Sequence, residues 1–315
     1  MYILGFDIGG TKCAAVSAKW DGKEIKLLKK ARIDTDTTVP PCEMIERLML
    51  AADGILDAKP DSIGISCGGP LDSCRGVIMS PPNLPGWDNV EIVKTLEEHY
   101  GVSAHLLNDA NACAVAEWKF GAGKGTSNMV FLTFGTGLGA GLILDGRLYN
   151  GTNGNAGEVG HVRLNEGGPV GFGKAGSFEG FCSGGGIARL AFSMALEKAK
   201  NGTPPAYYRE GMDPSDVSAR TVAEAARSGD ETAMEVYRIS GEHLGKGLAI
   251  LVDILNPERI VIGSVYARSG DLLRESMERV LRSEALSCAL EVCEIVPAQL
   301  GDNVGDYAAV AAALS

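Results

Sequence analysis

The sequence predicts an α/β protein made of two similar halves, and three observations support this fold class. Apolar strand-like runs alternate with helical patterns along 315 residues, a length that allows two lobes with separate cores. A strand, turn, strand, turn, strand arrangement at residues 2–33 recurs at residues 129–151. The 42 glycines exceed average usage and indicate many turns and close backbone approaches.

Each half is expected to continue with further helices and strands after its three opening strands. In the first half a helix is expected at residues 42–56, a buried strand at 62–69 and a long Pro/Gly/Asn-rich loop at 70–87. A helix at 90–100, a strand at 103–107 and a helix from about 111 follow. In the second half a Gly-rich stretch is expected at residues 151–186, followed by helices at 187–200, 222–226 and 232–251. A strand at 259–263, a helix from 271, a strand at 291–299 and a last helix after 302 complete this half. We therefore predict an N-terminal lobe at residues 1–120, with the C-terminal helix 303–315 packing on it, and a C-terminal lobe at residues 121–302.

Charge and cysteine usage restrict the classes of function. A formal net charge of −11 and a pI near 4.9 argue against binding to a nucleic acid backbone, which requires a basic surface. The eight cysteines form no C-x-x-C pair, so reduced thiols are expected rather than disulfides. No secretory leader or membrane-length apolar stretch is recognisable, and no helix-turn-helix precedes the first strand. We expect a cytoplasmic protein without nucleic acid or membrane partners.

A glycine turn follows the first strand, with the sequence Asp7-Ile8-Gly9-Gly10-Thr11-Lys12. Glycines without side chains let backbone N–H groups approach an anion, and the threonine and lysine add a hydroxyl and a positive charge. The alternative interpretation is a tight hairpin with a capping aspartate.

A second turn, Thr133-Phe134-Gly135-Thr136-Gly137, occupies the equivalent place in the second half. Two such turns predict binding of the polyphosphate of ATP. The run from Gly135 to Ala140 also matches a dinucleotide-binding fingerprint, with Glu158 at about the expected spacing, but the following residues favour a strand and the fingerprint requires a helix. The run 168–174 resembles a P-loop, but Ala175 replaces its Mg²⁺-binding hydroxyl.

These motifs, in this order, resemble those of the ROK sugar kinases, and the resemblance covers essentially the whole chain. Besides the two turns, the motifs that carry it are Gly68-Gly69-Pro70 with Asn83 to Trp87, Asn108-Asp109-Ala110-Asn111, Glu158-Val159-Gly160-His161, and Asn256-Pro257-Glu258 leading to Ile262-Gly263. The resemblance implies an actin-like ATPase (ribonuclease H-like) fold, with two similar α/β lobes and a cleft between them. It also makes a homodimer or homotetramer the expected assembly.

The resemblance assigns candidate roles to individual residues. The expected nucleotide-binding residues are Asp7, Gly9, Gly10, Thr11, Lys12, Thr133, Gly135, Thr136, Gly137 and Gly263. The expected sugar-binding residues are Gly69, Asn83, Asn108, Glu158, His161 and Glu179. ATP and Mg²⁺ are the expected cofactors, with Asp7 helping to position the metal. The alternative for His161 is a structural histidine, and for Glu179 a solvated surface charge.

Asp109 is the candidate catalytic base, because a carboxylate at this motif position could accept the proton of an attacking sugar hydroxyl. For an isolated aspartate between a strand and a helix, a plain N-cap is the alternative. We expect the helix N-terminus to hold the Asp109 carboxylate ionised.

The chain departs from the family at two places. Most ROK members carry three cysteines that join the motif histidine in a structural zinc site, but the corresponding residues 170–179 here contain no cysteine. We therefore predict no structural zinc and expect Val170 and Phe172 to order the segment by burial instead. Gly263-Ser264 stands where the family commonly has paired glycines, which leaves the effect of Ser264 on nucleotide binding open.

The predicted function is ATP-dependent phosphorylation of a hexose or N-acetylhexosamine, a small-molecule sugar, with Asp109 as base. A sugar-responsive transcriptional regulator is the first alternative, because the ROK family includes repressors with the same sugar-binding body. A non-catalytic sugar-binding protein is the second. The sequence does not select the sugar, because discrimination among epimers depends on one or two hydrogen bonds.

Overall fold

The computed structural model describes all 315 residues, and contacts divide the chain into two compact units. The first unit contains Met1–Ser127, Gly141–Ala156 and Gln299–Ser315, and the second contains Asn128–Ala140 and Gly157–Ala298. The main difference from the predicted lobes is that residues 141–156 belong with the first unit. The packing of Gly141 explains this, because a Cβ atom there would lie 2.4 Å from Cβ of Ala114.

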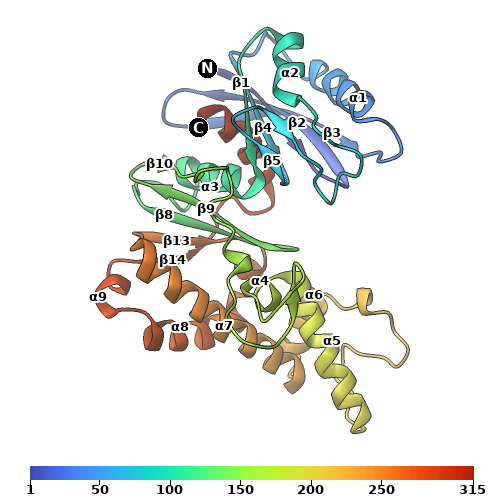
Figure 1. The fold of residues 1–315 in the computed structure, drawn as a ribbon, viewed down its shortest axis with the longest axis vertical. Helices are drawn as coiled ribbons and strands as arrows, with labels where there is room; N and C mark the ends of the chain where they lie inside the picture. Colours follow the sequence, from blue (N-terminus) through green and yellow to red (C-terminus); the bar gives the residue numbers. More distant parts are fainter. The chain divides into compact units, whose positions relative to one another are not determined.

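The first unit is built on a five-stranded mixed sheet with the order β3-β2-β1-β4-β7 (Figure 1). The strands are β1 Tyr2–Ile8, β2 Lys12–Trp20, β3 Ile25–Asp34, β4 Ser62–Cys67 and β7 Ala104–Asn108. The first three form an antiparallel meander, and β4 and β7 run parallel to β1. The helices are α1 Pro41–Asp53, α2 Ile92–Tyr100, α3 Asp109–Phe120 and α10 Val304–Ala311.

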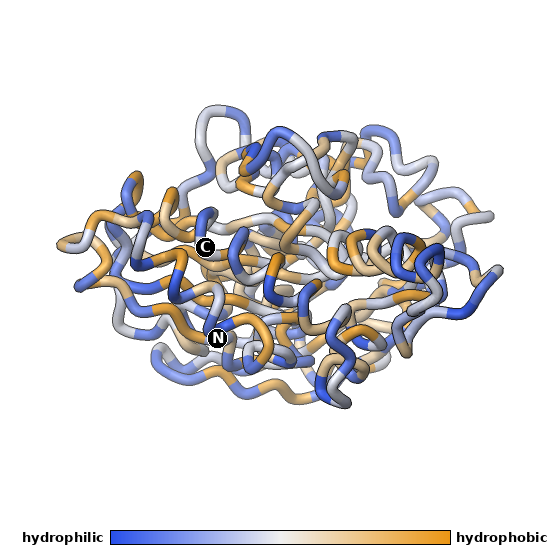
Figure 2. The backbone as a smooth tube through the Cα atoms, turned by 90° about the horizontal axis from the view of Figure 1, so that it is seen from below, coloured by the Kyte–Doolittle hydropathy of each residue, from blue (hydrophilic) through white to orange (hydrophobic).

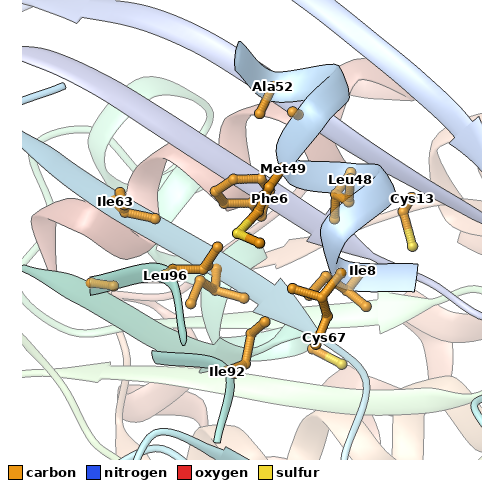
Figure 3. Packing of buried hydrophobic residues seen from close by; sticks show 14 of the residues in the cluster. Phe6, Ile8, Cys13, Leu48, Met49, Ala52, Ile63, Cys67, Ile92 and Leu96 are labelled. Atoms are coloured by element: carbon orange, nitrogen blue, oxygen red, sulfur yellow. The ribbon is translucent and has the colours of Figure 1, made fainter. Parts of the chain in front are cut away.

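Alternation of side chains along β1 directs alternate residues to opposite faces of this sheet. Leu4, Phe6 and Ile8 join a buried cluster with residues of α1 and α2, including Leu48 and Leu96 (Figure 3). Proline at the first position of α1 suits a helix start, and Gly101 ends α2 in the left-handed conformation with φ 64°. Packing of these two helices on one face of the sheet therefore fixes the meander and β4.

The opposite face of the same sheet carries glycines where α10 lies. A Cβ atom at Gly5 would lie 2.9 Å from the backbone of Ala309, and one at Gly64 would lie 2.1 Å from the Ala309 carbonyl oxygen. The alanine-rich α10 can therefore approach the strand backbones closely. This contact places the first turn of α10 beside the end of β1.

A second sheet, which includes β10 and part of β9 from residues 141–156, repeats the same strand topology with the order β10-β9-β8-β13-β14. The strands are β8 Met129–Phe134, β9 Leu138–Leu144, β10 Arg147–Leu148, β13 Arg259–Ile262 and β14 Glu294–Pro297. As in the first sheet, three meander strands are followed by two parallel strands. The internal repeat predicted from the two glycine turns is therefore present in both sheets.

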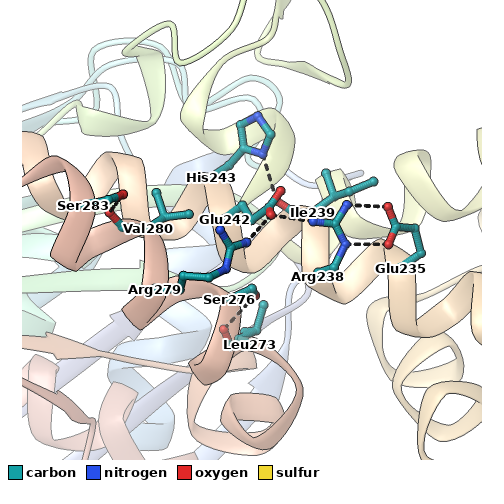
Figure 4. A network of polar contacts seen from close by, with 10 residues as sticks. All are labelled: Glu235, Arg238, Ile239, Glu242, His243, Leu273, Ser276, Arg279, Val280 and Ser283. Carbon is teal, nitrogen blue, oxygen red and sulfur yellow. Dashed lines mark hydrogen bonds and ion pairs between the residues drawn. The ribbon is translucent and has the colours of Figure 1, made fainter.

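The helices of the second unit pack closely through small residues. They are α4 Phe178–Phe181, α5 Gly184–Lys200, α6 Ala219–Arg227, α7 Glu231–Leu255, α8 Val265–Glu284 and α9 Ser287–Leu290. On α7, Gly241 and Gly245 face α8, and a Cβ atom at Gly241 would lie 2.0 Å from Ser276 Oγ. Glu242 of α7 also accepts hydrogen bonds from Arg238 and from Arg279 of α8 (Figure 4). Small residues and this charged network hold the two helices together.

The predicted elements are present with shifted ends. The helix expected from residue 271 begins at Val265 and bends at Ser269, and the loop at 70–87 contains the short hairpin β5 Leu71–Asp72 with β6 Val77–Ile78. The run 168–174 forms a second hairpin, β11 Val170–Gly171 with β12 Lys174–Ala175, rather than a P-loop. Hydrophilic residues gather on the outward turns (Figure 2). None of the helices combines the length and apolar character needed to cross a membrane.

Candidate active site

The ends of three neighbouring strands bring together the candidate residues of the first unit. Asp7 lies near the end of β1, Gly69 follows β4, and Asn108 ends β7. Because β1, β4 and β7 are parallel and adjacent, their carboxyl ends meet at one edge of the sheet. This edge is where ligands bind in open α/β sheets.

The first glycine turn is held by its own backbone and by Thr35. The N–H of Gly9 donates to the carbonyl of Lys12 at 3.1 Å, and the Thr35 hydroxyl donates to the carbonyl of Gly9 at 2.6 Å. The side chains of Thr11 and Lys12 are exposed. The turn is therefore ordered without using the hydroxyl and ammonium groups expected to contact phosphate.

Asn83 connects the first turn with the end of β4. A Cβ atom at Gly10 would lie 2.1 Å from the carbonyl oxygen of Asn83, and one at Gly68 would lie 3.6 Å from the Asn83 amide group. A Cβ atom at Gly69 would lie 3.4 Å from Nδ2 of Asn108. Glycine at these positions lets the predicted phosphate turn and the predicted sugar-binding residues lie side by side.

Asn108, and not Asp109, is the N-cap of α3. Its Oδ1 accepts hydrogen bonds from the N–H groups of Ala110 at 2.9 Å and Asn111 at 3.2 Å. Asp109 is the first residue of the helix, and its carboxylate accepts from the Ala110 N–H at 2.7 Å. The N-cap alternative for Asp109 is therefore wrong, and no other side chain donates a hydrogen bond to its carboxylate.

Burial, and not the helix N-terminus, has the larger effect on the pKa of Asp109. Part of the side chain reaches solvent, but the protein atoms crowded around the carboxylate desolvate it and raise its pKa above 3.8. The hydrogen bond from Ala110 acts in the opposite direction and is the smaller effect. Asp109 is consequently a stronger base than a fully solvated aspartate.

Asp7 lies in a group of three carboxylates. Burial, together with the charges of Asp306 and Asp109, raises the pKa of Asp7 to about 6, and Lys12 and Lys30 oppose the shift. Asp306, in the first turn of α10, is 7% exposed and pairs with Lys30 at 2.6 Å. A Cβ atom at Gly305 would lie 2.8 Å from Oδ2 of Asp7.

This donor set fits a hard divalent cation. Mg²⁺ prefers carboxylate oxygen ligands and keeps several waters, and the unfavourable proximity of Asp7 to two other carboxylates would be relieved by a cation there. No group of three or more His, Cys, Asp or Glu side chains forms a ready-made metal cage in the structure. Asp7 therefore fits a metal held jointly with phosphate oxygens.

The second glycine turn joins β8 to β9. The Gly135 N–H donates to the Gly137 carbonyl at 3.1 Å, and the Thr133 hydroxyl accepts from the Gly139 N–H at 2.9 Å. Because β9 follows the turn directly, no helix begins there, and the dinucleotide alternative is excluded. Gly263 lies beside this turn, since its N–H donates to Leu132 at the end of β8.

Glu179 links this turn to the candidate sugar-binding motif. Its Oε2 accepts from the Leu138 N–H at 3.0 Å and would lie 2.8 Å from a Cβ atom at Gly137. A Cβ atom at Gly160, between Glu158 and His161, would lie 3.3 Å from Cβ of Glu179. The structure thus brings Glu179, the 133–137 turn and the 158–161 segment together within the second unit, and Glu179 is no free surface charge.

The segment that lacks the family's cysteines is ordered differently from our expectation. Val170 is 46% exposed and Phe172 is 75% exposed, so burial of these two side chains does not order it. Instead, the hairpin β11–β12 turns at Phe172 and Gly173, which both have positive φ, and Lys174 Nζ donates to the His161 carbonyl at 2.7 Å. Backbone pairing, this hydrogen bond and an edge-on contact between the Phe172 and His161 rings, whose centroids lie 5.1 Å apart, order the segment in place of the burial we predicted.

Sequence reasoning missed two groups near these residues. Gly184 and Gly185, in the first turn of α5, donate to the carbonyls of Gly135 and Thr136 at 2.7 and 3.3 Å. The second group is the ion pair between Asp306 and Lys30. The signals available were the Gly184-Gly185-Gly186 run after Ser183, which caps α5, and the Gly-Asp pair at the start of α10.

Solved structures place this arrangement of two sheets in a known class. The structure matches a ROK hexokinase from Thermus thermophilus with a TM-score of 0.81, 31% identity and coverage of 100% of this chain and 98% of that one. It matches a ROK family glucokinase from Streptomyces griseus, solved with glucose and AMPPNP, with a TM-score of 0.76, 28% identity and coverage of 99% and 98%. The chain has the actin-like ATPase fold of these sugar kinases.

The chain belongs to the ROK family, whose model matches residues 3–315. A glucokinase of Halalkalibacterium halodurans is 33% identical over 96% of this chain and 92% of its own length. A xylose repressor of Caldicellulosiruptor bescii is 30% identical over 80% of this chain and 62% of its own length. The family thus includes both kinases and regulators.

Proposed function

We propose that this protein is an ATP-dependent kinase that phosphorylates a hydroxyl of a hexose or N-acetylhexosamine, with Asp109 as general base. The observation that carries the proposal is the division of labour between Asn108 and Asp109. Asn108 caps α3, which leaves an Asp109 carboxylate of raised pKa at the carboxyl edge of the sheet. The similarity to glucokinases over nearly the whole chain supports the same activity.

The reaction follows from the properties of these residues. The sugar hydroxyl donates a hydrogen bond to Asp109, its oxygen forms a bond to the γ-phosphorus of ATP, and the bond from that phosphorus to the bridging oxygen of ADP breaks. The hydroxyl proton passes to Asp109 and then to solvent. Because phosphoryl transfer has a loose transition state, orientation of the hydroxyl and stabilisation of phosphate charge contribute most of the rate.

The remaining candidate residues supply binding and orientation. Backbone N–H groups of the turns at residues 9–12 and 133–137, with Lys12 and the threonine hydroxyls, are the proposed phosphate ligands. When bound, Mg²⁺ would neutralise charge on the phosphate oxygens, and Asp7 is its proposed ligand. The proposed sugar ligands are Gly69, Asn83, Asn108, Glu158, His161 and Glu179.

ADP release measured against a panel of hexoses and N-acetylhexosamines tests the proposal. We expect one sugar to be preferred, and Asp109→Asn to lower kcat on that sugar by roughly 10²- to 10⁴-fold, the usual contribution of a general base. The matched control is Asp57→Asn, because Asp57 is an exposed partner of Lys29. Unchanged kcat in Asp109→Asn, with wild-type nucleotide binding, would refute the assignment of the base.

A sugar-responsive regulator is the second candidate, and the xylose repressor relative is the observation in its favour. The net charge of −11 disfavours a DNA-binding surface on this chain. DNA binding at low salt, gained or lost on adding a sugar, would favour the regulator. Sugar binding without ADP release from any sugar would favour a non-catalytic binding protein.

A further inference from the structure

A cavity lies in the first unit, and Asp109 is not among the residues that line it. Its volume is about 740 Å³, within the range of small-molecule sites. The turn between β5 and β6, α2, the edge strand β7, the second half of α3, the β10 hairpin and the C-terminus form its walls. None of the proposed nucleotide or sugar ligands lines it.

Three cationic side chains line this cavity: Arg75, Lys119 and Arg147. None of them forms an ion pair in the structure, although the chain carries an excess of acidic residues and most other arginines are paired. The Lys119 ammonium lies 4.7 Å from the centre of the Trp118 ring, and burial lowers its pKa. Three cations that form no ion pair produce a local positive potential that attracts an anion.

The acidic groups in the same walls offset only part of the charge of the three cations, because they number two. One of them is Glu97, whose Oε1 accepts from the backbone N–H of Ala104 at 3.0 Å. The other acidic group is the C-terminal carboxylate of Ser315. His105 also lines the cavity and adds a further nitrogen donor.

The chemistry of the walls selects the class of anion. Arginine guanidinium groups match the geometry of phosphate oxygens, and a phosphate monoester carries a charge of about −1.5 to −2 at neutral pH, which suits three cations. Ser73 and Asn150 offer hydroxyl and amide groups, and Trp118 offers a ring edge, for a polyhydroxy body. We propose that this cavity binds a phosphate monoester of a small polyhydroxy compound, held by Arg75, Lys119 and Arg147.

The same elements connect this site to Asp109. Strand β7 and helix α3 form walls of the cavity, and they also carry Asn108 and Asp109 at their junction. Asn150, in the cavity wall, accepts a hydrogen bond from the buried Asn111 amide at 3.1 Å, two residues beyond Asp109. A ligand that moves Asn150 therefore acts on the first turn of α3. The proposed site is consequently placed to regulate catalysis.

Cysteine protection tests binding without relying on activity. Cys74 is exposed and lines the cavity, whereas Cys42 and Cys288 are exposed elsewhere and serve as internal controls. We expect glucose 6-phosphate to slow alkylation of Cys74 saturably, by at least about fivefold once the site is filled, and to leave Cys42 and Cys288 unchanged. Glucose and inorganic phosphate, used separately, distinguish recognition of the sugar body from recognition of the phosphate.

Variants identify the groups that bind. The double variant Arg75→Ala, Arg147→Ala should weaken binding by about tenfold or more for each arginine, because charge-assisted contacts are removed. The matched control is Arg220→Ala, which removes an exposed arginine of the second unit. Binding is also measured in Asp109→Asn, so that loss of kinase activity and loss of this site are told apart.

Three outcomes would overturn the proposal. Cys74 could remain unprotected at up to about 10 mM ligand, where even a weak site would be filled. The double variant could bind glucose 6-phosphate as tightly as the parent. Protection by inorganic phosphate alone, with none from the sugar phosphate, would overturn the assigned ligand class.

Discussion

Ionisation of Asp7 links stability to function at the scale of single residues. Burial, with the charges of Asp306 and Asp109, raises the pKa of Asp7 to about 6 from an ordinary value of 3.8. The folded chain therefore holds this proton more tightly than the unfolded chain. The stabilising contribution is complete below about pH 4 and is lost as the pH rises through about 6. Above pH 6 the ionised Asp7 therefore lowers the free energy of unfolding.

The first prediction concerns Asp7→Asn. Because this change removes the ionisation penalty, we expect the variant to be more stable than the parent at pH 8 by up to about 3 kcal/mol, the equivalent of roughly two pKa units. At pH 4 the two proteins should be nearly equal. Urea unfolding at both pH values measures the difference. Its activity with Mg²⁺ and ATP should fall at the same time, which is the usual conflict between stability and function.

Added Mg²⁺ provides the control for this prediction. The cation should stabilise the parent at pH 8 more than it stabilises Asp7→Asn, because only the parent offers the carboxylate ligand. A stability difference between the two proteins that does not change with pH would contradict the raised pKa of Asp7.

Phe172 shows how a local conformation determines the effect of a substitution. The residue lies at the turn of the β11–β12 hairpin with φ 42°, and it is 75% exposed. Asparagine tolerates this left-handed conformation better than phenylalanine does. We expect Phe172→Asn to change the free energy of unfolding by no more than about 1 kcal/mol. Truncation of a buried phenylalanine, by comparison, lowers the free energy of unfolding by about 3–5 kcal/mol. Phe178→Ala, at a position 1% exposed in the same segment, is the control that should show the larger loss.

At the scale of elements, the contact between β4 and α10 depends on Gly64. An alanine Cβ there would lie 2.1 Å from the carbonyl oxygen of Ala309, a backbone atom that cannot rotate away. We expect Gly64→Ala to lower the free energy of unfolding by about 3 kcal/mol, at the upper end of overpacking effects. Urea unfolding measures it.

Gly54→Ala in the same unit is the matched control for that experiment. Gly54 has φ −66°, and its added Cβ would make an ordinary contact at 3.5 Å, so the change should be neutral or stabilising by about 0.4–1 kcal/mol. Equal effects of the two substitutions would show that α10 does not lie against β4 as described.

At the scale of the whole molecule, Glu117 anchors two segments through which the chain passes between its units. Its buried carboxylate accepts from the N–H groups of Ala122 at 2.7 Å, Gln299 at 3.2 Å and Leu300 at 2.9 Å. Gly121 makes room for it, since a Cβ atom there would lie 2.0 Å from Oε2 of Glu117. Gln299 and Leu300, which lie 182 and 183 positions after Glu117 in the chain, are thereby fixed to α3.

We therefore predict that Glu117→Ala lowers the free energy of unfolding by about 3–5 kcal/mol, because three backbone N–H groups lose their acceptor in a buried place. Hydrogen exchange should accelerate at residues 122, 299 and 300. Glu98→Ala, on the exposed side of α2, should change the stability by less than about 0.5 kcal/mol. Unchanged exchange at residues 299 and 300 would contradict the anchoring role.

The sequence predicted much of the fold because its signals are local. Alternating apolar residues and Asp-Gly turns determined the two meanders, and the strand character after Gly137 excluded the dinucleotide alternative. The sequence did not predict which residue at the end of β7 caps α3, and the structure shows that it is Asn108 and not Asp109. Both are good N-cap residues, and the backbone at the end of β7 decides between them.

The sequence by itself determined the family, the repeated α/β topology and the residue types available for phosphate and hydroxyl chemistry. The tertiary structure alone decided the pKa of Asp7 and Asp109, the exposure of Phe172 and the partners of Glu117. These properties depend on atoms from residues far apart in the chain, such as Asp7 and Asp306, whose proximity is created only when α10 packs against the first sheet. Desolvation and charge interactions act through space, so neither can be obtained from local sequence patterns.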